Sequence, residues 1–485
     1  MFSQSVTTGA HREGNEAFAP GHLGELTQVI PFSLVDEVLA TTQRTQRRIR
    51  KLPSRVMVYF VLALALFGEC GYRGVWAALV AGPDIPDADP SGPALGQARR
   101  RIGSAPLIAL FDRLKGPLAA ADALGSHWQG LRTVAWDGTC LQVADSPANA
   151  AFFGRGSGTN GTGGFPLVRL SALVECGTRA LVEAVAGPLI QSEQAQARLL
   201  CRALRPGMLL LADRSSAGFP LMRAAAATGA HLLWRIGVDR VPPVVHELPD
   251  GSYLSMVAGV NERNRLLRWA RRRHAVPPQV AGVAVRVIEA HVTACAGDGR
   301  VKAGIWRLVT TLLDAERYPA ADLAALYHQR WEAETTYFGL KVTLRGANRV
   351  LRSQSVDGVR QELYGLLVVY QATRHIAVDT AAQAGIDPDR ISLTVILRTA
   401  RHTVINATGI APAPGALLTS KIREAVLHPR ELGPKRRRAR ILPHRVKRPI
   451  SNYAYNLTRK DAAMSHVTIA IVIGPPADLT PSRSP

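Results

Sequence analysis

The sequence predicts an α/β fold in which helices flank a mixed β-sheet and a helical domain precedes it. Two β-branched runs, at 165–176 and 179–189, are joined by a Gly-containing turn, as in a hairpin. An apolar strand that ends at Asp213 is followed by a helix of small residues and a second apolar strand. A hairpin followed by alternating helices and strands indicates a sheet with both parallel and antiparallel pairs.

Residues 1–125 are expected to form a helical N-terminal domain. An amphipathic segment from Ser33 leads through a basic stretch into the apolar run Val56–Phe67. That run has 12 residues, whereas a membrane-spanning helix needs about 20, so we expect a buried helix. The basic helices favour contact with DNA, and a merely solvated basic surface is the alternative.

Residues 126–400 are expected to form the central domain. Its first strand, at 133–145, is interrupted by Asp137, and the hairpin and a helix from Ser192 follow. Residues 238–300 have the character of a β-rich insertion. A further strand and a helix beginning near Pro319 then complete the domain, because Pro is well tolerated in a first helical turn.

The net charge of the chain is strongly positive. Its 485 residues include 59 Lys and Arg against 37 Asp and Glu, which gives a formal charge of +22. The C-terminal region, 401–485, is basic and carries a cluster of Lys and Arg at 435–448. This excess favours a polyanionic partner, because each neutralised phosphate releases counterions. Nucleic acid is preferred to a membrane, since no apolar run is long enough to span one.

The cysteines and the N-terminus indicate the compartment. Five cysteines are scattered without CxxC spacing, so neither a zinc site nor a disulfide framework is predicted. The chain begins without an apolar stretch after a basic start, so no secretory signal is expected. These features favour a reducing cytoplasm.

Three acidic residues occupy positions at which catalytic or ligand-binding residues are often found. Asp213 follows the buried strand MLLLA, at the edge where open α/β sheets bind ligands. Asp137 interrupts an apolar strand, where an uncompensated charge is costly to bury. Each could be a cap or a paired structural acid. Together with Glu334 they could converge on divalent metal, because crowded carboxylates stay ionised only beside cations.

The segment YHQRWEAETTYFGLK, at 327–341, places four polar side chains at helical spacing. If it is one α-helix, then Tyr327, Arg330, Glu334 and Lys341 share a face. That face is either a solvated salt-bridge ladder or a surface that grips a polyanion beside a carboxylate.

The same residues carry a family resemblance. Tyr327, Arg330, Glu334 and Lys341 match the Y-x2-R-x3-E-x6-K signature, and the chain resembles the insertion-sequence transposases of the family numbered four. WDGT, around Asp137, is similar to the first-aspartate motif of these DDE enzymes, and LLADR, around Asp213, to the second. The second motif departs from the family pattern after Arg214, where serines stand in place of the frequent Gly.

The resemblance implies an RNase H-like core and a set of roles. Asp137, Asp213 and Glu334 become the catalytic residues and the ligands of two Mg²⁺ or Mn²⁺ ions. The phosphates beside the scissile bond would be bound by Tyr327, Arg330 and Lys341, with Tyr327 either donating to a phosphate or orienting its neighbours.

Two further groups have alternatives that the sequence leaves open. In hairpin-forming relatives, a Trp at the place of Trp306 stacks on a flipped base, and a buried core Trp is the other explanation. Arg345, Asn348, Arg349 and Arg352 extend the basic segment beyond Lys341 and would either follow the DNA backbone or form a solvated face.

The activity implied is DNA transposition. The protein would bind the terminal inverted repeats of its element, cleave phosphodiesters, possess strand-transfer activity and act by cut-and-paste, with hairpin ends as one route. Its partners would be double-stranded DNA, at element ends and target, and a second copy in a synaptic homodimer at the nucleoid. The alternatives are a catalytically silent or domesticated DNA-binding protein and a metal-dependent nuclease that does not join strands.

Overall fold

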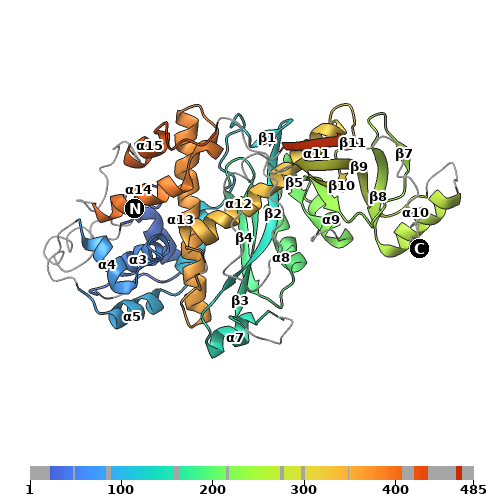
Figure 1. Ribbon diagram of the computed structural model, residues 1–485. Coiled ribbons are helices and arrows are strands. Elements are labelled where there is room, and N and C mark those ends of the chain that lie inside the picture. The colour runs from blue at the N-terminus through green and yellow to red at the C-terminus, as the bar shows by residue number, and fades with distance from the viewer. Residues whose placement is uncertain are drawn as a thin grey trace, which may run out of the picture.

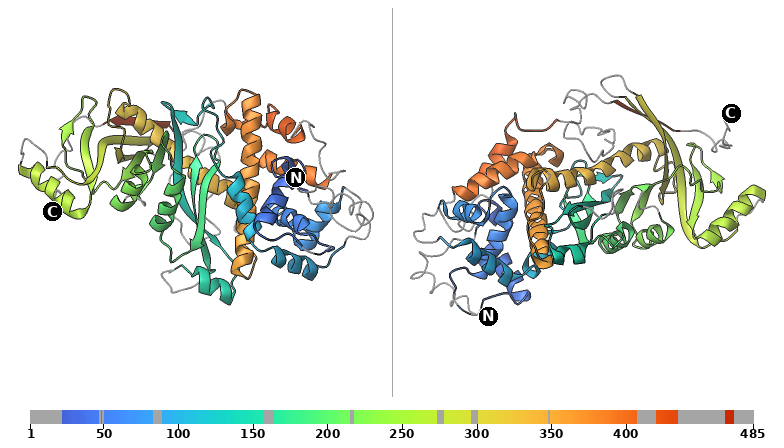
Figure 2. Two further views of the ribbon diagram at one scale, coloured as in Figure 1. Left: turned by 180° about the vertical axis from the view of Figure 1, so that it is seen from behind. Right: turned by 60° about the horizontal axis from the view of Figure 1, so that its bottom comes forward.

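The computed structural model describes most of the chain (Figure 1). The described residues are 22–46, 48, 50–82, 89–156, 164–214, 218–272, 278–295, 301–347, 349–406, 420–434 and 466–471. The basic cluster at 435–448 and Asn348 lie outside them. The molecule is elongated, with the N-terminal helices at one end and α10 (Val260–Arg272) at the other (Figures 1 and 2).

One mixed sheet runs through the molecule, and its first half holds five strands. These are β2 (Leu131–Gln142), β3 (Leu167–Glu175), β4 (Leu181–Pro188), β5 (Met208–Ala212) and β6 (His231–Ile236), in the order β4-β3-β2-β5-β6. Strand β3 is antiparallel to both neighbours, whereas β2, β5 and β6 are parallel. Counted along the chain, this order is 3-2-1-4-5, the RNase H-like arrangement. The predicted fold class, a mixed sheet flanked by helices, is confirmed.

The same sheet continues through the segment predicted as an insertion. Strand β6 pairs with β10 (Val301–Thr310), and β9 (Gly282–Cys295), β8 (Tyr253–Ala258) and β7 (His246–Glu247) follow, all antiparallel. From the C-terminal region, β11 (His466–Ile471) pairs with β9. The β-rich segment is therefore an extension of the core sheet, because its strands join the ladder at β10.

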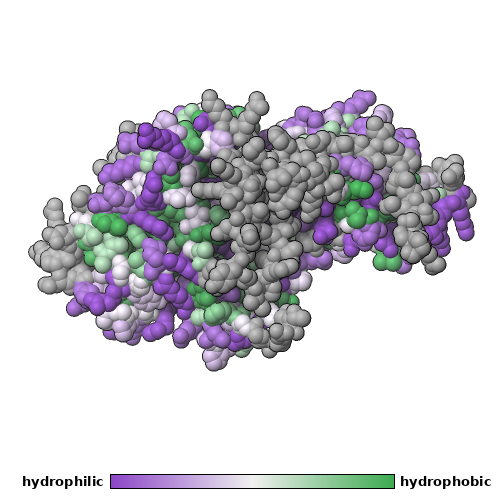
Figure 3. Space-filling model, in the orientation of Figure 1, coloured by the Kyte–Doolittle hydropathy of each residue, from purple (hydrophilic) through white to green (hydrophobic). Residues whose placement is uncertain are grey.

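Helix α10 projects from this extension. Its sequence is strongly basic, and Leu266 is its buried residue. Hydrophilic side chains cover this end of the molecule (Figure 3). Arg271 and Arg272 lie exposed at its C-terminal end, whereas Arg273 lies outside the described residues.

Successive side chains of each strand point to opposite faces of the sheet. Helices cover both faces of its first half. On one face, α8 (Glu193–Leu200) and α9 (Phe219–Ala226) pack over a cluster that contains Trp136 and Trp234, whose rings meet edge to face at 5.2 Å. On the other face lie α12 (Trp331–Phe338) and α13 (Val356–Gln383). That face contributes Ala135, Leu209, Leu211 and Leu233.

The N-terminal helices pack against α13, which lies between them and the sheet (Figure 1). They are η2 (Leu26–Gln28), α2 (Phe32–Thr41), α3 (Ser54–Leu66), α4 (Tyr72–Val80), α5 (Gly92–Ile102) and α6 (Ala105–Leu114). The apolar run at 56–67 is the buried body of α3, as its composition predicts. No helix among the described residues is long and apolar enough to cross a membrane.

The remaining elements connect these layers. They are β1 (His127–Trp128), α7 (Pro147–Phe153), η3 (Cys201–Ala203), α11 (Ala320–Tyr327), η5 (His328–Arg330), η6 (Gly339–Leu344), η7 (Pro388–Arg390), α14 (Leu393–Ile405) and α15 (Ser420–Leu427). The cysteines Cys70, Cys140, Cys176 and Cys201 are free thiols.

One buried cation ties α12 to the sheet. Arg179, in the turn between β3 and β4, adopts a φ of 60°. Its Nε donates to Glu332 Oε2 on α12 at 2.5 Å, and its Nη2 donates to Asp389. The three side chains are 12–14% exposed, so each charge depends on its partners.

We therefore predict that Arg179→Ala lowers the free energy of unfolding by about 3–5 kcal/mol, because two largely buried carboxylates lose their cation. Urea unfolding measures this change. The control is Arg398→Ala, since Arg398 is 66% exposed and pairs with Glu431 at the surface, where loss of a pair costs about 1 kcal/mol or less. Equal losses in the two variants would contradict the structural role of Arg179.

Candidate active site

The strand register brings the two predicted aspartates to the same level of the sheet. In the parallel pair, Arg132 lies beside Met208 and Ala135 beside Leu211. Two residues further along, the same register sets Asp137 level with Asp213. Both side chains then belong to the face that α12 covers, because alternate residues share a face.

Asp137 lies within β2 and is held by its backbone. Its Oδ1 accepts a hydrogen bond from Gly138 N at 2.8 Å. Its carbonyl accepts from the Tyr337 hydroxyl at 2.5 Å, and that hydroxyl in turn accepts from Ala172 N, on β3, at 2.9 Å. Tyr337 thus bridges the two strands beside the acid, and it follows Glu334 by three residues on α12.

Burial raises the pKa of Asp137 to about 7. The bond from Gly138 and the charge of Arg330 act in the opposite direction, whereas the neighbouring Glu334 and Glu193 raise the pKa further. This carboxyl group therefore changes its charge near neutral pH.

Asp213 follows the last residue of β5. Its carbonyl accepts a hydrogen bond from Trp234 Nε1 at 2.9 Å. Its Oδ1 is buried and has no hydrogen-bond partner among the described residues. A buried carboxylate oxygen without a donor is costly, so this atom fits a site that a cation completes.

Arg330 lies among all three acids. It is 6% exposed, and its Nη2 donates to Glu334 Oε1 at 3.0 Å. Burial alone would lower the pKa of Arg330, but Tyr327, Asp213, Glu334 and Asp137 together raise it. The guanidinium is thus the positive charge around which the acids gather.

The acids do not form a ready metal-binding group. Across the described ranges, no three His, Cys, Asp or Glu side chains are grouped so as to hold one metal ion. Glu334 is instead paired with Arg330. The three acids are electrostatic neighbours of Arg330, and their convergence on metal ions stays a prediction. The pair with Arg330 engages Glu334 through Oε1.

The signature segment is helical, as predicted, but is not one regular α-helix. A 3-10 turn covers His328–Arg330, and a π-helix covers Gly339–Leu344, on either side of α12. These segments have fewer and more than 3.6 residues per turn, respectively. Tyr327 and Lys341 nonetheless contact residues beside Asp213 and Asp137, and Arg330 pairs with Glu334.

Tyr327 points into the core. Its hydroxyl donates to the carbonyl of Ala212 at 3.1 Å, and the residue is 2% exposed. Burial raises its pKa. Of the two roles considered for Tyr327, orientation of its neighbours fits this geometry, and donation to a DNA phosphate does not, because the hydroxyl is buried and bonded.

Lys341 and Trp306 flank the acids. Lys341 Nζ donates to Thr139 Oγ1, two residues beyond Asp137, at 2.9 Å. Trp306 is partly exposed, its ring meets that of Tyr327 edge to face at 5.3 Å, and Arg235 lies 5.6 Å above its centre. Trp306 is therefore neither a free surface on which a base could stack nor a fully buried core residue.

Sequence reasoning missed a fourth acid at this site. Glu193 is the first residue of α8, and a Cβ added to Gly138 would lie 3.3 Å from its Cγ, Cδ and Oε1. No donor or cation among the described residues pairs with this carboxylate. The acidic start of a helix is ordinary capping sequence, so only the close approach to Gly138 distinguishes Glu193.

Comparisons with known proteins agree with the motifs. Residues 20–112 match the family described as insertion element 4 transposase N-terminal, and residues 128–371 match the transposase DDE domain. The chain is 25% identical over 395 residues to the transposase InsG for insertion sequence element IS4 of Escherichia coli (strain K12), covering 80% of this chain and 85% of the relative.

Two further proteins are similar over different lengths. The putative transposase InsZ of Escherichia coli (strain K12) is 29% identical over 218 residues, covering 42% of this chain and 68% of the relative. The piggyBac transposase, in a synaptic complex with hairpin DNA, superimposes with a TM-score of 0.44 at 9% identity over 84% of this chain and 85% of that one.

The pKa of Asp137 predicts how stability depends on pH. The folded chain holds a proton on this group up to about pH 7, whereas the ordinary value is 3.8. Between these values the folded state binds more protons than the unfolded state, so the free energy of unfolding falls as pH rises. We expect a contribution of roughly 2–4 kcal/mol, which Asp137→Asn removes.

Urea unfolding at pH 5 and pH 8, in the presence of a chelator, measures this difference. The exposed Asp122 provides the control, and Asp122→Asn should keep the pH dependence of the parent. The same decline with pH in Asp137→Asn as in the parent would show that another group causes it.

Proposed function

The chain belongs to the insertion element 4 family of DDE transposases, and we propose from this premise that it cleaves and joins DNA at Asp137, Asp213 and Glu334. It would bind the terminal inverted repeats of its element, cleave them and transfer the freed 3′ ends to a target. The observation that carries the proposal is the gathering of the three acids around the buried Arg330.

Asp137, Asp213 and Glu334 would hold two Mg²⁺ or Mn²⁺ ions, since hard carboxylate oxygens suit these cations. The unpartnered Asp213 Oδ1 and the raised pKa of Asp137 support this assignment. When bound, such ions activate a water or a 3′-hydroxyl and offset charge on the leaving oxygen. Glu193 lies against Gly138, on the face of β2 opposite to the Asp137 side chain, and its charge would support the ions from across the strand without ligating them.

Arg330 has two tasks in this proposal. It offsets the charge of the three acids while the pair with Glu334 is closed. Its Nε is buried without a partner among the described residues. Once Glu334 turns to a metal ion, the planar guanidinium has donors for a phosphate oxygen of the DNA.

The residues around the acids position the DNA. Lys341, beside Thr139 on β2, would contact a phosphate next to the scissile bond. Tyr327 holds α11 to the end of β5 through Ala212. Trp306 would stack on a base only after Arg235 moves from its ring, and this would favour cut-and-paste excision through hairpin ends.

The partners proposed are double-stranded DNA, at element ends and target, and a second copy of the chain in a synaptic homodimer. Joining two ends of one element requires two active sites in a single complex, which supports the homodimer. The transposase of a bacterial element would act on the nucleoid in the cytoplasm. The central and N-terminal domains proposed from the sequence, 126–400 and 1–125, would contact the DNA together.

We predict that Asp213→Asn and Glu334→Gln each reduce Mg²⁺-dependent cleavage of element-end DNA by at least about 10³-fold, since metal-assisted charge stabilisation is worth several kcal/mol. Binding of the same DNA should change little. Gel analysis of a labelled element end measures both. The exposed Glu316 offers the control Glu316→Gln, which should cut normally.

Two outcomes would favour the alternatives. Full cleavage by both variants would remove these residues from catalysis. Cleavage without strand transfer by the parent would indicate a nuclease, and binding without cleavage would indicate a catalytically silent DNA-binding protein.

We also predict that Glu193→Gln weakens Mn²⁺ binding by about 10–100-fold, as loss of supporting groups does at metal sites. Electron paramagnetic resonance of free Mn²⁺ measures the affinity without any reaction. Glu316→Gln should bind Mn²⁺ as the parent does. An unchanged affinity in Glu193→Gln would leave this acid with a role in α8 alone.

A further inference from the structure

A polar cavity lies between the N-terminal helices and α13, and none of the three acids lines it. It has a volume of about 120 Å³. Leu64 and Ala65 of α3 and Leu366 of α13 contribute apolar walls. The polar wall holds four arginines and one acid, namely Arg99, Arg345, Arg349, Arg352 and Glu362.

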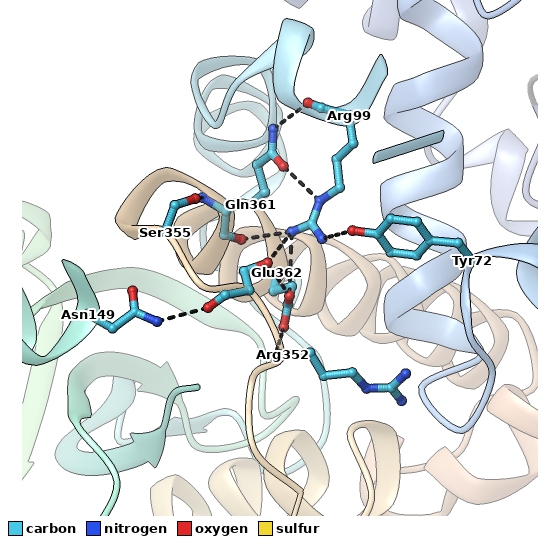
Figure 4. Close-up of polar contacts among 9 residues, drawn as sticks. Tyr72, Arg99, Asn149, Arg352, Ser355, Gln361 and Glu362 are labelled. Carbon is cyan, nitrogen blue, oxygen red and sulfur yellow. Dashed lines mark hydrogen bonds and ion pairs between the residues drawn. The ribbon is translucent and has the colours of Figure 1, made fainter. Parts of the chain in front are cut away.

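Two of these arginines are committed to the fold. Arg99 is 5% exposed and donates to Gln361 Oε1 at 2.8 Å, to the Tyr72 hydroxyl at 2.7 Å and to Ser353 Oγ at 2.8 Å (Figure 4). Arg352 donates to the carbonyls of Cys70, at 3.1 Å, and Gly68. These bonds join α4, α5 and the end of α3 to α13 and to the segment that precedes it.

The other two arginines have donors to spare. Arg345 Nε and Nη1 and Arg349 Nη1 are buried and have no hydrogen-bond partner among the described residues. Burial lowers the pKa of Arg345, but a guanidinium stays charged in proteins. Arg345 and Arg349 line the same cavity and carry buried N–H groups without an acceptor among the described residues, and an anion would satisfy these groups.

The acid in the cavity wall does not supply that anion. Glu362 Oε2 accepts from Arg352 N at 2.8 Å, and Oε1 accepts from the Ser353 hydroxyl and lies 3.5 Å from Arg99 Nη2. Glu362 is thus engaged with the committed side of the wall (Figure 4). Among the described lining residues it is the one carboxylate beside four guanidiniums.

We propose that this cavity binds a phosphoryl group through Arg345 and Arg349, and that the group is a backbone phosphate of the DNA substrate. Planar guanidinium forks match phosphate oxygens and bind them at two points. Guanidinium groups bind carboxylates in the same way, but the net charge of +22 and the proposed action on DNA favour phosphate as the anion.

The position of Arg345 in the chain supports DNA as the source. Arg345 directly follows the π-helix that carries Lys341, and it lies eleven residues after Glu334. The DNA source rests on the proposed function, because it requires the acids to act on the same duplex.

The test uses the full chain and inorganic phosphate. At constant ionic strength, phosphate in place of chloride should raise the Tm of the parent by about 2 °C or more. The double variant Arg345→Gln with Arg349→Gln should lose this rise. The matched control is Arg398→Gln with Arg430→Gln, which removes the same charge from two exposed residues and should keep it.

The second measurement is the salt dependence of binding to a labelled element end. Loss of one phosphate contact should reduce the slope of log K against log salt by about 0.9 in the cavity variant, and the control should keep the parent slope. If the cavity variant does not fold, Leu64→Glu serves instead, because it keeps both arginines and places a carboxylate in the cavity. Leu64→Glu should also lose the phosphate-induced rise in Tm and show the reduced salt slope.

Each outcome decides one part. If the cavity variant shows a reduced salt slope and also loses the phosphate-induced rise in Tm, the proposal is supported. If the cavity variant loses the phosphate-induced rise in Tm but keeps the parent salt slope, DNA is overturned as the source and the cavity is assigned to a small phosphate-containing anion. A Tm that does not respond to phosphate in the parent overturns the site. Parent protein that is protected by phosphate but does not cut element ends counts against the proposed function alone.

Discussion

The buried guanidinium of Arg330 is the interaction on which the candidate site depends. Asp137, Asp213 and Glu334 approach one another from two strands and a helix, and three carboxylates at such range repel unless a cation offsets them. Arg330 does so from inside the core, where it is 6% exposed and bonded to Glu334. Arg330 thereby offsets the charge of the neighbouring acids, and its pair with Glu334 engages one oxygen of that carboxylate. In the proposed mechanism, opening this pair would free that oxygen for a metal ion.

The irregular helical segment at 327–344 is bonded to the core sheet at several points. Its hydroxyl at Tyr327 reaches the end of β5, and its Tyr337 bridges β2 and β3 beside Asp137. After the π-turn, Lys341 reaches Thr139 on β2. A regular α-helix would place side chains at these offsets on one stripe. This one segment thus contacts the end of β5 and the middle of β2.

The sequence was sufficient for the strands, the mixed sheet and the order of the acids, because those depend on local apolar alternation and on spacing along the chain. It also predicted the buried α3. It did not predict that the segment at 238–300 extends the core sheet, since strand pairing between β6 and β10 is a long-range choice. Nor did it predict the burial of the Tyr327 hydroxyl or the approach of Glu193 to Gly138. Both depend on where separate elements meet in three dimensions.

The arginines show why charge alone does not locate a ligand. Arg179 is buried like Arg330, but its donors meet Glu332 and Asp389, so it stabilises the fold. Arg99 likewise donates hydrogen bonds to Gln361, Tyr72 and Ser353. Arg330, Arg345 and Arg349 differ because buried N–H groups remain without an acceptor in the described structure. Arg169 and Arg374 also carry buried N–H groups without a partner among the described residues. What distinguishes Arg330, Arg345 and Arg349 is therefore the surroundings of these groups, namely the acids around Arg330 and the cavity that Arg345 and Arg349 line.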